Sequence, residues 1–265
     1  MLKIGIISNT PRVGKTTLTL SLAHTYSRSQ RAKVAIFSTG ELSHVTEPLM
    51  ETQDKDEAAT AGVFKAMLET QTIRGEQLFS YAVRSGYDEV FIFDLFDRKD
   101  DKNQNFEFLA RTISSIDAKM VLVEIVGDPA STENKPIVDQ CDVLLYLFNE
   151  DRYSINQLRL YAKALPDKYK DKVFYVCSEF DPWVMADKKL SGLVGKGTKD
   201  FMLFDYNPAI TKMFIDGTYS KFADAVVYGH EDFLKTRQQL LTIMQKLYDE
   251  PGRKRIKEIK DWPKK

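Results

Sequence analysis

A short polar loop near the start of the chain has the residue types that bind phosphate. Residues 9–17 read Asn-Thr-Pro-Arg-Val-Gly-Lys-Thr-Thr, between an apolar run and a helix-compatible segment. The N–H groups of such a loop and of the first helical turn present partial positive charge to phosphate oxygens. Lys15 would add a full charge at the β- and γ-phosphates, and the Thr16 hydroxyl would bind Mg²⁺. The expected nucleotide contacts are Thr10, Pro11, Arg12, Val13, Gly14, Lys15, Thr16 and Thr17.

The loop departs at one position from the phosphate-loop pattern G-x-x-x-x-G-K-[ST]. Asn9 stands where the first Gly is expected. Asn tolerates left-handed backbone angles better than most residues, so the loop can still close. A Gly-Lys-Thr-Thr sequence can also simply cap a helix. Its position after a strand of buried type favours nucleotide binding, because strand, loop and helix in that order are the context the motif requires.

Three carboxylates stand at or near strand ends, where a phosphate loop usually finds the acid that holds Mg²⁺ or its water. Asp94 ends one apolar strand, Glu124 lies inside another, and Asp128 follows Glu124 in a Gly-Asp-Pro turn. A charge within a nearly continuous apolar strand is costly unless it is paired or bound to metal. Glu124 is therefore the leading metal ligand beside Thr16. A paired Glu at a strand end remains open, and Asp128 is either a turn residue or a more distant acid of the magnesium site.

Other reactive residue types show no arrangement that suggests different chemistry. His24, His44 and His230 are isolated, and neither a Ser-His-Asp pattern nor a cysteine pair is visible. Cys141 and Cys177 lie beside apolar runs, which predicts buried free thiols in a reducing compartment.

These residues need a scaffold, and the alternation of short apolar runs with helical patterns supplies one. The expected strands are Leu2–Ile7, Lys33–Ser38, Glu89–Asp94, Lys119–Val126, Asp142–Phe148, Lys172–Cys177 and Phe201–Phe204. The expected helices are Thr16–Gln30, Ala58–Glu69, Gly75–Ser85, Asn105–Ile116, Ser154–Leu165 and His230–Asp249. Continuous apolar strands predict a doubly wound α/β fold with a mainly parallel sheet and helices on both faces. Ligands of such sheets bind at the carboxyl ends of the strands.

Composition predicts one globular domain followed by a basic tail. Lys and Arg balance Asp and Glu at 38 each over 265 residues, and 43% of the residues are apolar. We expect a domain over residues 1–250 and a tail over 251–265, separated at Pro251-Gly252. The apolar run at the N-terminus is too short for a signal sequence and no run reaches a membrane span, so we expect a cytoplasmic protein.

The tail is electrostatically distinct from the domain. Residues 253–265 carry seven basic and two acidic side chains. Ile256, Ile259 and Trp262 recur at helical spacing among these basic residues. This pattern fits a weak peripheral membrane anchor, which dimerisation would strengthen. It also fits non-specific contact with DNA phosphates, or a solvated chain end.

Several segments in order resemble the ParA/MinD group of deviant P-loop ATPases, whose branches include the TadZ-like pilus-positioning proteins. The resemblance covers most of residues 1–222. The matching segments are Ile4–Ser8 leading into Val13–Ala23, Lys33–Ser38, Met120–Glu124, Gln140–Tyr146, and Leu203–Ile210 with Gly217. The first segment is the specific one, and the later ones are weak singly but follow the family's order.

The chain departs from this family at functional positions, which makes it an atypical member. The family's signature lysine, which reaches the partner's ATP, corresponds to Thr10, and Arg12 nearby could supply that charge. The family's Asp-x-Asp after the second strand corresponds to Ser38 and Gly40, so rapid hydrolysis is in doubt. Ser178 stands at an adenine-contacting Asn, and the late segment near the adenine contains Asn207 and Pro208.

The resemblance implies an ATPase that binds ATP and Mg²⁺, forms an ATP-dependent homodimer, and positions or partitions a cargo. DNA, a pilus or secretion apparatus, and a division component are all candidates for this cargo. Catalysis would fall to Lys15, Arg12 and Glu124, with Thr16, Glu124 and Asp128 at the metal, and a partner protein would stimulate slow turnover. Two alternatives remain: an adaptor that binds nucleotide without hydrolysis, and a small-molecule ligase of the dethiobiotin-synthetase type.

Overall fold

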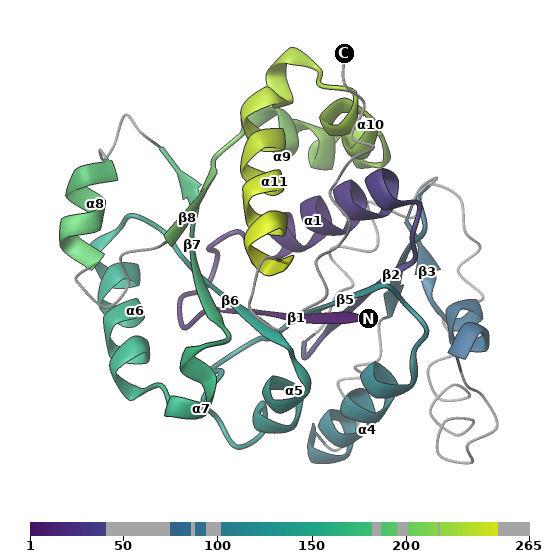
Figure 1. Cartoon of the computed structure of the whole chain (residues 1–265), viewed down its shortest axis with the longest axis horizontal. Helices are drawn as coiled ribbons and strands as arrows, with labels where there is room; N and C mark the ends of the chain where they lie inside the picture. Colours follow the sequence, from purple (N-terminus) through teal and green to yellow (C-terminus); the bar gives the residue numbers. More distant parts are fainter. Residues whose placement is uncertain are drawn as a thin grey trace.

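A mainly parallel sheet runs through the middle of the molecule (Figure 1). Its strands are β1 Leu2–Ile7, β2 Val34–Ser38, β3 Val83–Arg84, β4 Val90–Phe93, β5 Met120–Glu124, β6 Val143–Phe148, β7 Val173–Phe180 and β8 Phe201–Asp205. In the part of the chain that is described, the eight strands take the order β3-β4-β2-β5-β1-β6-β7-β8. Every neighbouring pair is parallel except the edge pair β3–β4. The doubly wound α/β fold predicted from the sequence is confirmed.

The computed structural model describes residues 1–40, 75–85, 88–93, 102–181, 187–194, 201–216 and 218–248. The predicted helix at 58–69, the carboxylate of Asp94 and the basic tail 251–265 lie outside these residues. In the described ranges, no helix has the length and apolar character that a bilayer span needs.

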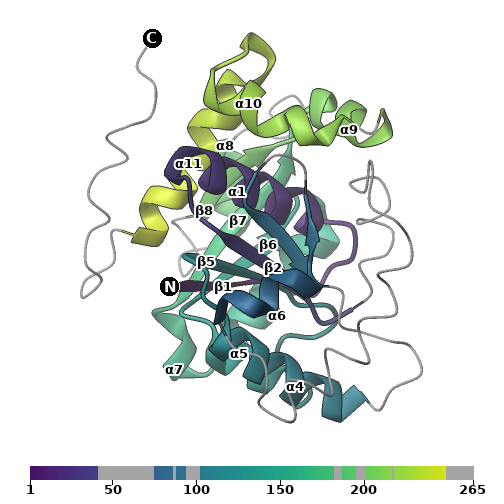
Figure 2. The same cartoon turned by 90° about the vertical axis from the view of Figure 1, so that its right-hand side faces the viewer.

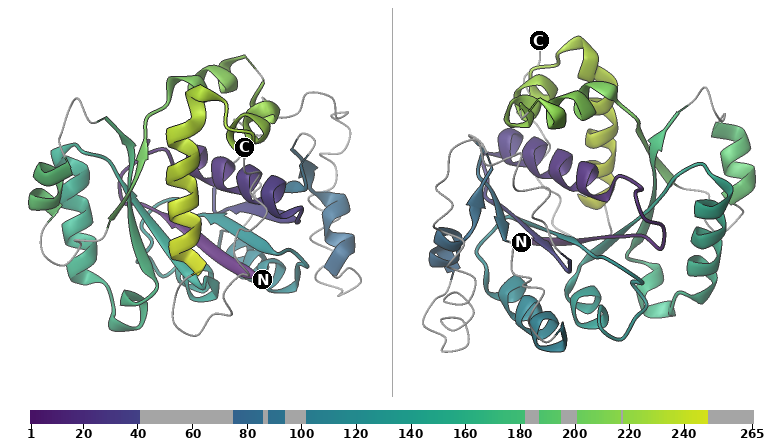
Figure 3. Two further views of the ribbon diagram at one scale, coloured as in Figure 1. Left: turned by 45° about the horizontal axis from the view of Figure 1, so that its top comes forward. Right: turned by 180° about the vertical axis from the view of Figure 1, so that it is seen from behind.

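Helices cover both faces of the sheet, as Figure 2 shows from the side. The α-helices are α1 Lys15–Gln30, α4 Lys102–Ser115, α5 Lys135–Gln140, α6 Arg152–Ala164, α7 Asp167–Lys170, α8 Asp187–Val194, α9 Pro208–Ile215, α10 Phe222–Val227 and α11 Leu234–Tyr248. Helix α1 packs on one face with α10 and α11, and α11 also contacts β8 (Figure 3). Helices α4 to α8 contribute to the apolar cluster on the other face.

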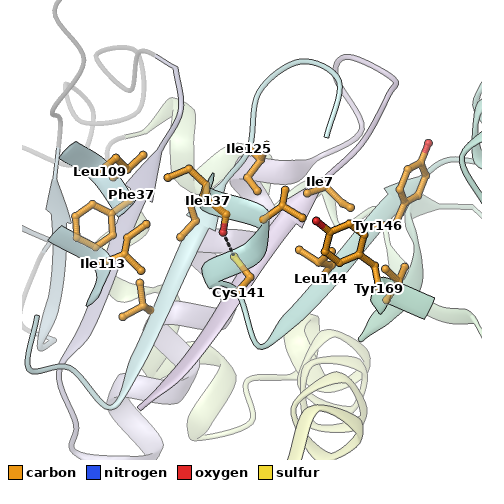
Figure 4. Close-up of a cluster of buried hydrophobic side chains, with 14 of the residues drawn as sticks. Ile7, Phe37, Leu109, Ile113, Ile125, Ile137, Cys141, Leu144, Tyr146 and Tyr169 are labelled. Carbon is orange, nitrogen blue, oxygen red and sulfur yellow. Dashed lines mark hydrogen bonds between the residues drawn. The ribbon is translucent and has the colours of Figure 1, made fainter. Parts of the chain in front are cut away.

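Strand parity sorts the buried side chains between the two faces, because successive strand residues point to opposite sides. Ile4 and Ile6 of β1 join the cluster that contains α1, whereas Ile7 joins the cluster beneath α4, α5 and α6. Figure 4 shows part of this second cluster, including Phe37, Ile137 and Cys141. Since both faces are buried, the strands read as continuous apolar runs, which is why the sequence located them well.

The two cysteines are buried and free, as predicted. Cys141 lies at the end of α5, and its Sγ–H donates to the carbonyl of Ile137 at 3.3 Å (Figure 4). Burial raises the pKa of the Cys141 thiol to about 12, so it remains protonated and unreactive at neutral pH.

One predicted helix is wrong in type. Residues 75–85 were expected to be helical, but they form a 3-10 helix, Gly75–Tyr81, followed by the edge strand β3. Phe79 packs on Phe91 and Phe93 beneath the sheet edge, which ends the helical segment early. Val83 then pairs with Ile92, so the chain gains strand hydrogen bonds there instead of helical ones. Here the tertiary contacts of the segment determine its structure more than its local helical pattern does.

Gly5 tests how tightly the sheet packs beneath the loop. A Cβ on Gly5 would lie 2.8 Å from Leu144 Cδ2 and 3.0 Å from Cys141 Sγ, both in the buried core. We expect Gly5→Ala to lower the free energy of unfolding by about 1–3 kcal/mol because the core is overpacked. Gly192→Ala is the matched control. It lies in α8 with open space around it, and it should stabilise by about 0.5–1 kcal/mol. Denaturant unfolding of both variants measures the difference, and equal stabilities would contradict this packing.

Candidate phosphate-binding site

The loop between β1 and α1 leaves the N-terminus of α1 without a side-chain hydrogen bond at its cap residue. Two of its residues have left-handed backbones, Arg12 with φ 55° and Gly14 with φ 70°. The sequence had suggested Asn9 for this role, but Asn9 is not among the left-handed residues of the described chain. Gly14 caps α1, no side chain bonds to the cap, and the first turn holds no acidic residue. The amides of this turn therefore keep their donors and partial positive charge available for an anion.

Thr16, in the first turn of α1, contacts Glu124 at the end of β5. The Thr16 hydroxyl lies 3.0 Å from Oε1 and 2.9 Å from Oε2 of Glu124. Glu124 shares strand parity with Leu122, so it projects toward α1, and β1 fixes it by pairing Ile6 opposite Glu124. The carboxylate is 8% exposed. A hydroxyl and a carboxylate are oxygen ligands that Mg²⁺ accepts, so these two residues fit a magnesium ion that takes its other ligands from phosphate and water.

Lys15 lies beside this pair in the first turn of α1. Burial lowers the pKa of the Lys15 ammonium, while the nearby charge of Glu124 acts in the opposite direction. Because the desolvation is only partly compensated, a bound phosphate would give the ammonium a stronger partner. The arrangement of Lys15, Thr16 and Glu124 agrees with the one expected from the sequence, and their roles toward nucleotide remain predictions.

Asp128 does not join this arrangement through a described contact. Its Oδ1 accepts from the N–H of Ala130 at 2.9 Å, in an exposed turn. Asn134 fastens the same turn by donating to the carbonyls of Val126 and Asp128. The turn role foreseen for Asp128 is therefore observed, and its role at a metal stays a prediction.

Thr10 and Gly40, two of the three positions where the resemblance expects charged residues, have close neighbours. Thr10 is 7% exposed, and its buried hydroxyl has no hydrogen-bond partner among the residues that the structure describes. A Cβ on Gly40 would lie 2.9 Å from Cγ2 of Val126. Thr39, next to Gly40, accepts from the N–H of Val126 and donates its own N–H to the carbonyl of Glu124. The end of β2 is thus fastened directly to the end of β5, with no room for a carboxylate unless Val126 shifts.

The residues expected near the base have structural contacts of their own. Ser178 has no exposed surface, and its hydroxyl donates to the carbonyl of Val13 in the phosphate loop. Asn207 caps α9, which begins at Pro208: its Oδ1 accepts from Ala209, and its Nδ2 donates to Asp232 and Thr236. Sequence reasoning missed the support that Ser178 gives the loop. Contacts of Ser178, Asn207 and Pro208 with a base remain predictions.

A Ser-His-Asp arrangement, not foreseen from the sequence, joins α1 to the β3–β4 hairpin. His24 Nδ1 lies 2.9 Å from Asp88 Oδ2, and Nε2 lies 3.1 Å from Ser85 Oγ. The expectation that His24 is isolated is therefore wrong, because residues 60 positions apart in sequence meet only after folding. Ser85 and His24 have no exposed surface, so a substrate has no access to the hydroxyl. This arrangement holds α1 in place.

Comparisons with known proteins show the fold more clearly than the sequence does. No protein-family model matches the chain, and no curated protein matches it either. Among solved structures, MinD of Pyrococcus horikoshii complexed with Mg-ADP is 14% identical, with TM-score 0.64 over 94% of this chain and 96% of its own. A ParA family ATPase of Chlorobium tepidum is 11% identical, with TM-score 0.63 over 91% and 98%. MinD in the Aquifex aeolicus MinC:MinD complex is 15% identical, with TM-score 0.62 over 95% and 97%.

These likenesses extend along the whole chain. They show that it has the fold of ParA/MinD family ATPases. In this chain the loop at residues 9–17 follows the carboxyl end of β1, and Glu124 ends the neighbouring central strand β5.

Ser178→Ala tests the support of the loop. The change removes the donor to the buried Val13 carbonyl, and we expect the free energy of unfolding to fall by about 1–2 kcal/mol. Ser115→Ala is the control, because its hydroxyl donates to Arg111 on an exposed turn of α4. Denaturant melts compare the two variants, and an unchanged midpoint for Ser178→Ala would show that the bond does not hold the loop.

Proposed function

We propose that this protein is a nucleotide-dependent switch ATPase of the ParA/MinD type. The observation that carries the proposal is the contact of Thr16 with Glu124 at the N-terminus of α1, whose cap has no side-chain hydrogen bond. An alcohol, a buried carboxylate and unpaired helix amides at one point are the donors that a magnesium–nucleotide complex requires. The Mg-ADP bound by the P. horikoshii relative supports ATP and Mg²⁺ as the ligands.

In this proposal the loop amides and Lys15 hold the phosphates, and Thr16 and Glu124 hold the metal. The metal would neutralise phosphate charge when bound. Arg12, exposed and left-handed in the loop, offers a second positive charge toward the phosphates or toward a second protomer. This assigns Lys15, Arg12 and Glu124 to catalysis.

We propose that turnover is slow and depends on a partner protein. Thr10 has no charge to offer, and Gly40 leaves no carboxylate to orient the attacking water. A nucleotide-binding adaptor without hydrolysis is the second candidate, and the close approach of Gly40 to Val126 favours it. The ligase of the dethiobiotin-synthetase type ranks third, and it predicts activity as an enzyme without a partner.

The switch would act through dimerisation. ATP would join two protomers, and that state would bind a cargo such as DNA, a pilus or secretion apparatus of the TadZ-like kind, or a division component. The A. aeolicus MinD bound to MinC supports a protein partner. We propose a cytoplasmic protein whose basic residues 253–265 contact a membrane surface or DNA.

Lys15→Ala is the first test of nucleotide binding. Losing the charged donor to two phosphates should weaken ADP and ATP-analogue binding by about a hundredfold, measured by calorimetric titration with Mg²⁺. Lys3→Ala is the matched control, because Lys3 lies at the opposite end of β1 from the loop. A Lys15→Ala variant that binds as tightly as wild type would remove the central assignment.

Sedimentation and phosphate release test the switch. We expect a monomer without nucleotide and with ADP, and a dimer with Mg²⁺ and a slowly hydrolysed ATP analogue. Phosphate release that rises when a partner is added supports the ATPase, whereas tight ATP binding without release supports the adaptor. A constant mass in all three nucleotide states would contradict the switch.

A further inference from the structure

The side chain of Glu179 covers the phosphate loop at Gly14. The three atoms closest to a Cβ built on Gly14 all belong to Glu179: Oε1 at 3.1 Å, Cγ at 3.2 Å and Cδ at 3.4 Å. Gly14 is the last loop residue before Lys15. A carboxylate therefore lies against the backbone that is expected to receive phosphate.

The backbone of β7 forces this position. Glu179 has φ 55°, the left-handed region, and the register of β7 with β8 shifts between Ser178 and Phe180. Both neighbours are fixed, since Ser178 is bonded to Val13 and Phe180 is 2% exposed in the core. A non-glycine residue in this conformation costs about 1–3 kcal/mol and persists only where its surroundings hold it. The bulge at the end of β7 thus holds the Glu179 side chain out over the loop.

Within the described part of the chain, no positive group pairs with this carboxylate. Among the described residues, Glu179 has no hydrogen bond and no ion pair. The residue is exposed, but partial desolvation of its carboxylate beside the loop raises its pKa. The ammonium of Lys15 interacts with Glu124. A negative charge next to a site that is proposed to bind phosphate is unfavourable, because the site and its ligand then have charges of the same sign. Such unfavourable arrangements concentrate at functional positions.

We propose that Glu179 is an electrostatic gate on the phosphate loop, which weakens the binding of polyphosphate nucleotides until its carboxylate swings aside. The proposal rests on the proposed function, because it needs phosphates to occupy the loop. The physical reason is Coulombic: a carboxylate within a few ångströms of Gly14 repels α- and β-phosphates through a partly desolvated site. Its own strand does not have to move, since rotation about the side-chain bonds frees the loop.

Glu179→Gln removes the charge and preserves the shape. We expect the variant to bind inorganic pyrophosphate and Mg·ADP about fivefold more tightly than wild type. For a slowly hydrolysed ATP analogue, the gain in affinity should be at least as large. Adenosine, which carries no phosphate, should bind the two proteins equally. The gain should shrink as salt is raised from low ionic strength to about 0.5 M, because screening weakens the repulsion.

Glu150→Gln is the matched control. Glu150 follows the neighbouring strand β6, and its carboxylate accepts from the N–H of Asp181 instead of covering Gly14. Its removal should change pyrophosphate affinity less than twofold. Glu179→Gly offers a second variant, which removes the carboxylate and relieves the left-handed backbone. It should bind pyrophosphate more tightly and melt at a higher temperature than wild type.

The outcomes separate the gate from the function on which it rests. The gate is supported if both Glu179 variants bind pyrophosphate more tightly than wild type and if combining either variant with Lys15→Ala abolishes this gain. Unchanged or weaker binding by Glu179→Gln, with Lys15→Ala still deficient, overturns the gate alone, and weaker binding would make Glu179 a nucleotide ligand. Failure of wild type and all Glu179 variants to bind pyrophosphate or nucleotide overturns the gate together with the proposed function.

Discussion

The site depends on one constraint: the carboxylate of Glu124, fixed inside the sheet, needs partners for its hydrogen bonds and its charge. Glu124 is in β5, between β1 and β2, where an unpaired charge would cost several kcal/mol. The Thr16 hydroxyl has one proton, which the two oxygens of Glu124 share, and the nearby ammonium of Lys15 supplies the opposite charge. Both residues reach Glu124 because α1 begins close to the end of β5. The chain therefore has to turn from Ile7 to Lys15 in a short loop, and the left-handed backbones of Arg12 and Gly14 achieve this turn.

Helix α1 is fastened along its length, which gives this contact a rigid base. His24 binds Asp88 and Ser85 of the β3–β4 hairpin, and Ser21 bonds with Tyr219. Arg28 at the far end of the helix pairs with Asp224 of α10. Polar contacts on three successive turns fix the rotation of the helix about its axis, and hence the direction of the Thr16 side chain. Sites held in this way keep their geometry because the supporting contacts lie outside the site.

Sequence patterns predicted the parts of this molecule that depend on local periodicity. The central strands were located to within a few residues, because burial on both faces leaves an unbroken apolar run. The loop motif and a charge within such a run predicted Thr16 and Glu124 as magnesium ligands, and the structure adds their direct hydrogen bond. Short helices such as α5 and α7, of six and four residues, were missed because they contain too few turns to show a period. The contacts of His24 and Ser178 join residues far apart in sequence, so no local pattern announces them.

The site has some of the residues that the ParA/MinD resemblance implies and lacks others. We propose the loop and the helix end for phosphate and Glu124 for the metal, whereas Thr10 and Gly40 are uncharged where the resemblance expects catalytic groups. A side chain at position 40 would also contact Val126, which is exposed and would have to shift. Glu179 adds negative charge at the place where phosphate would bind. In the switch that we propose, nucleotide binding and release would then control the change between monomer and dimer more than hydrolysis would. A partner that displaced Glu179 would then raise occupancy without supplying any catalytic group.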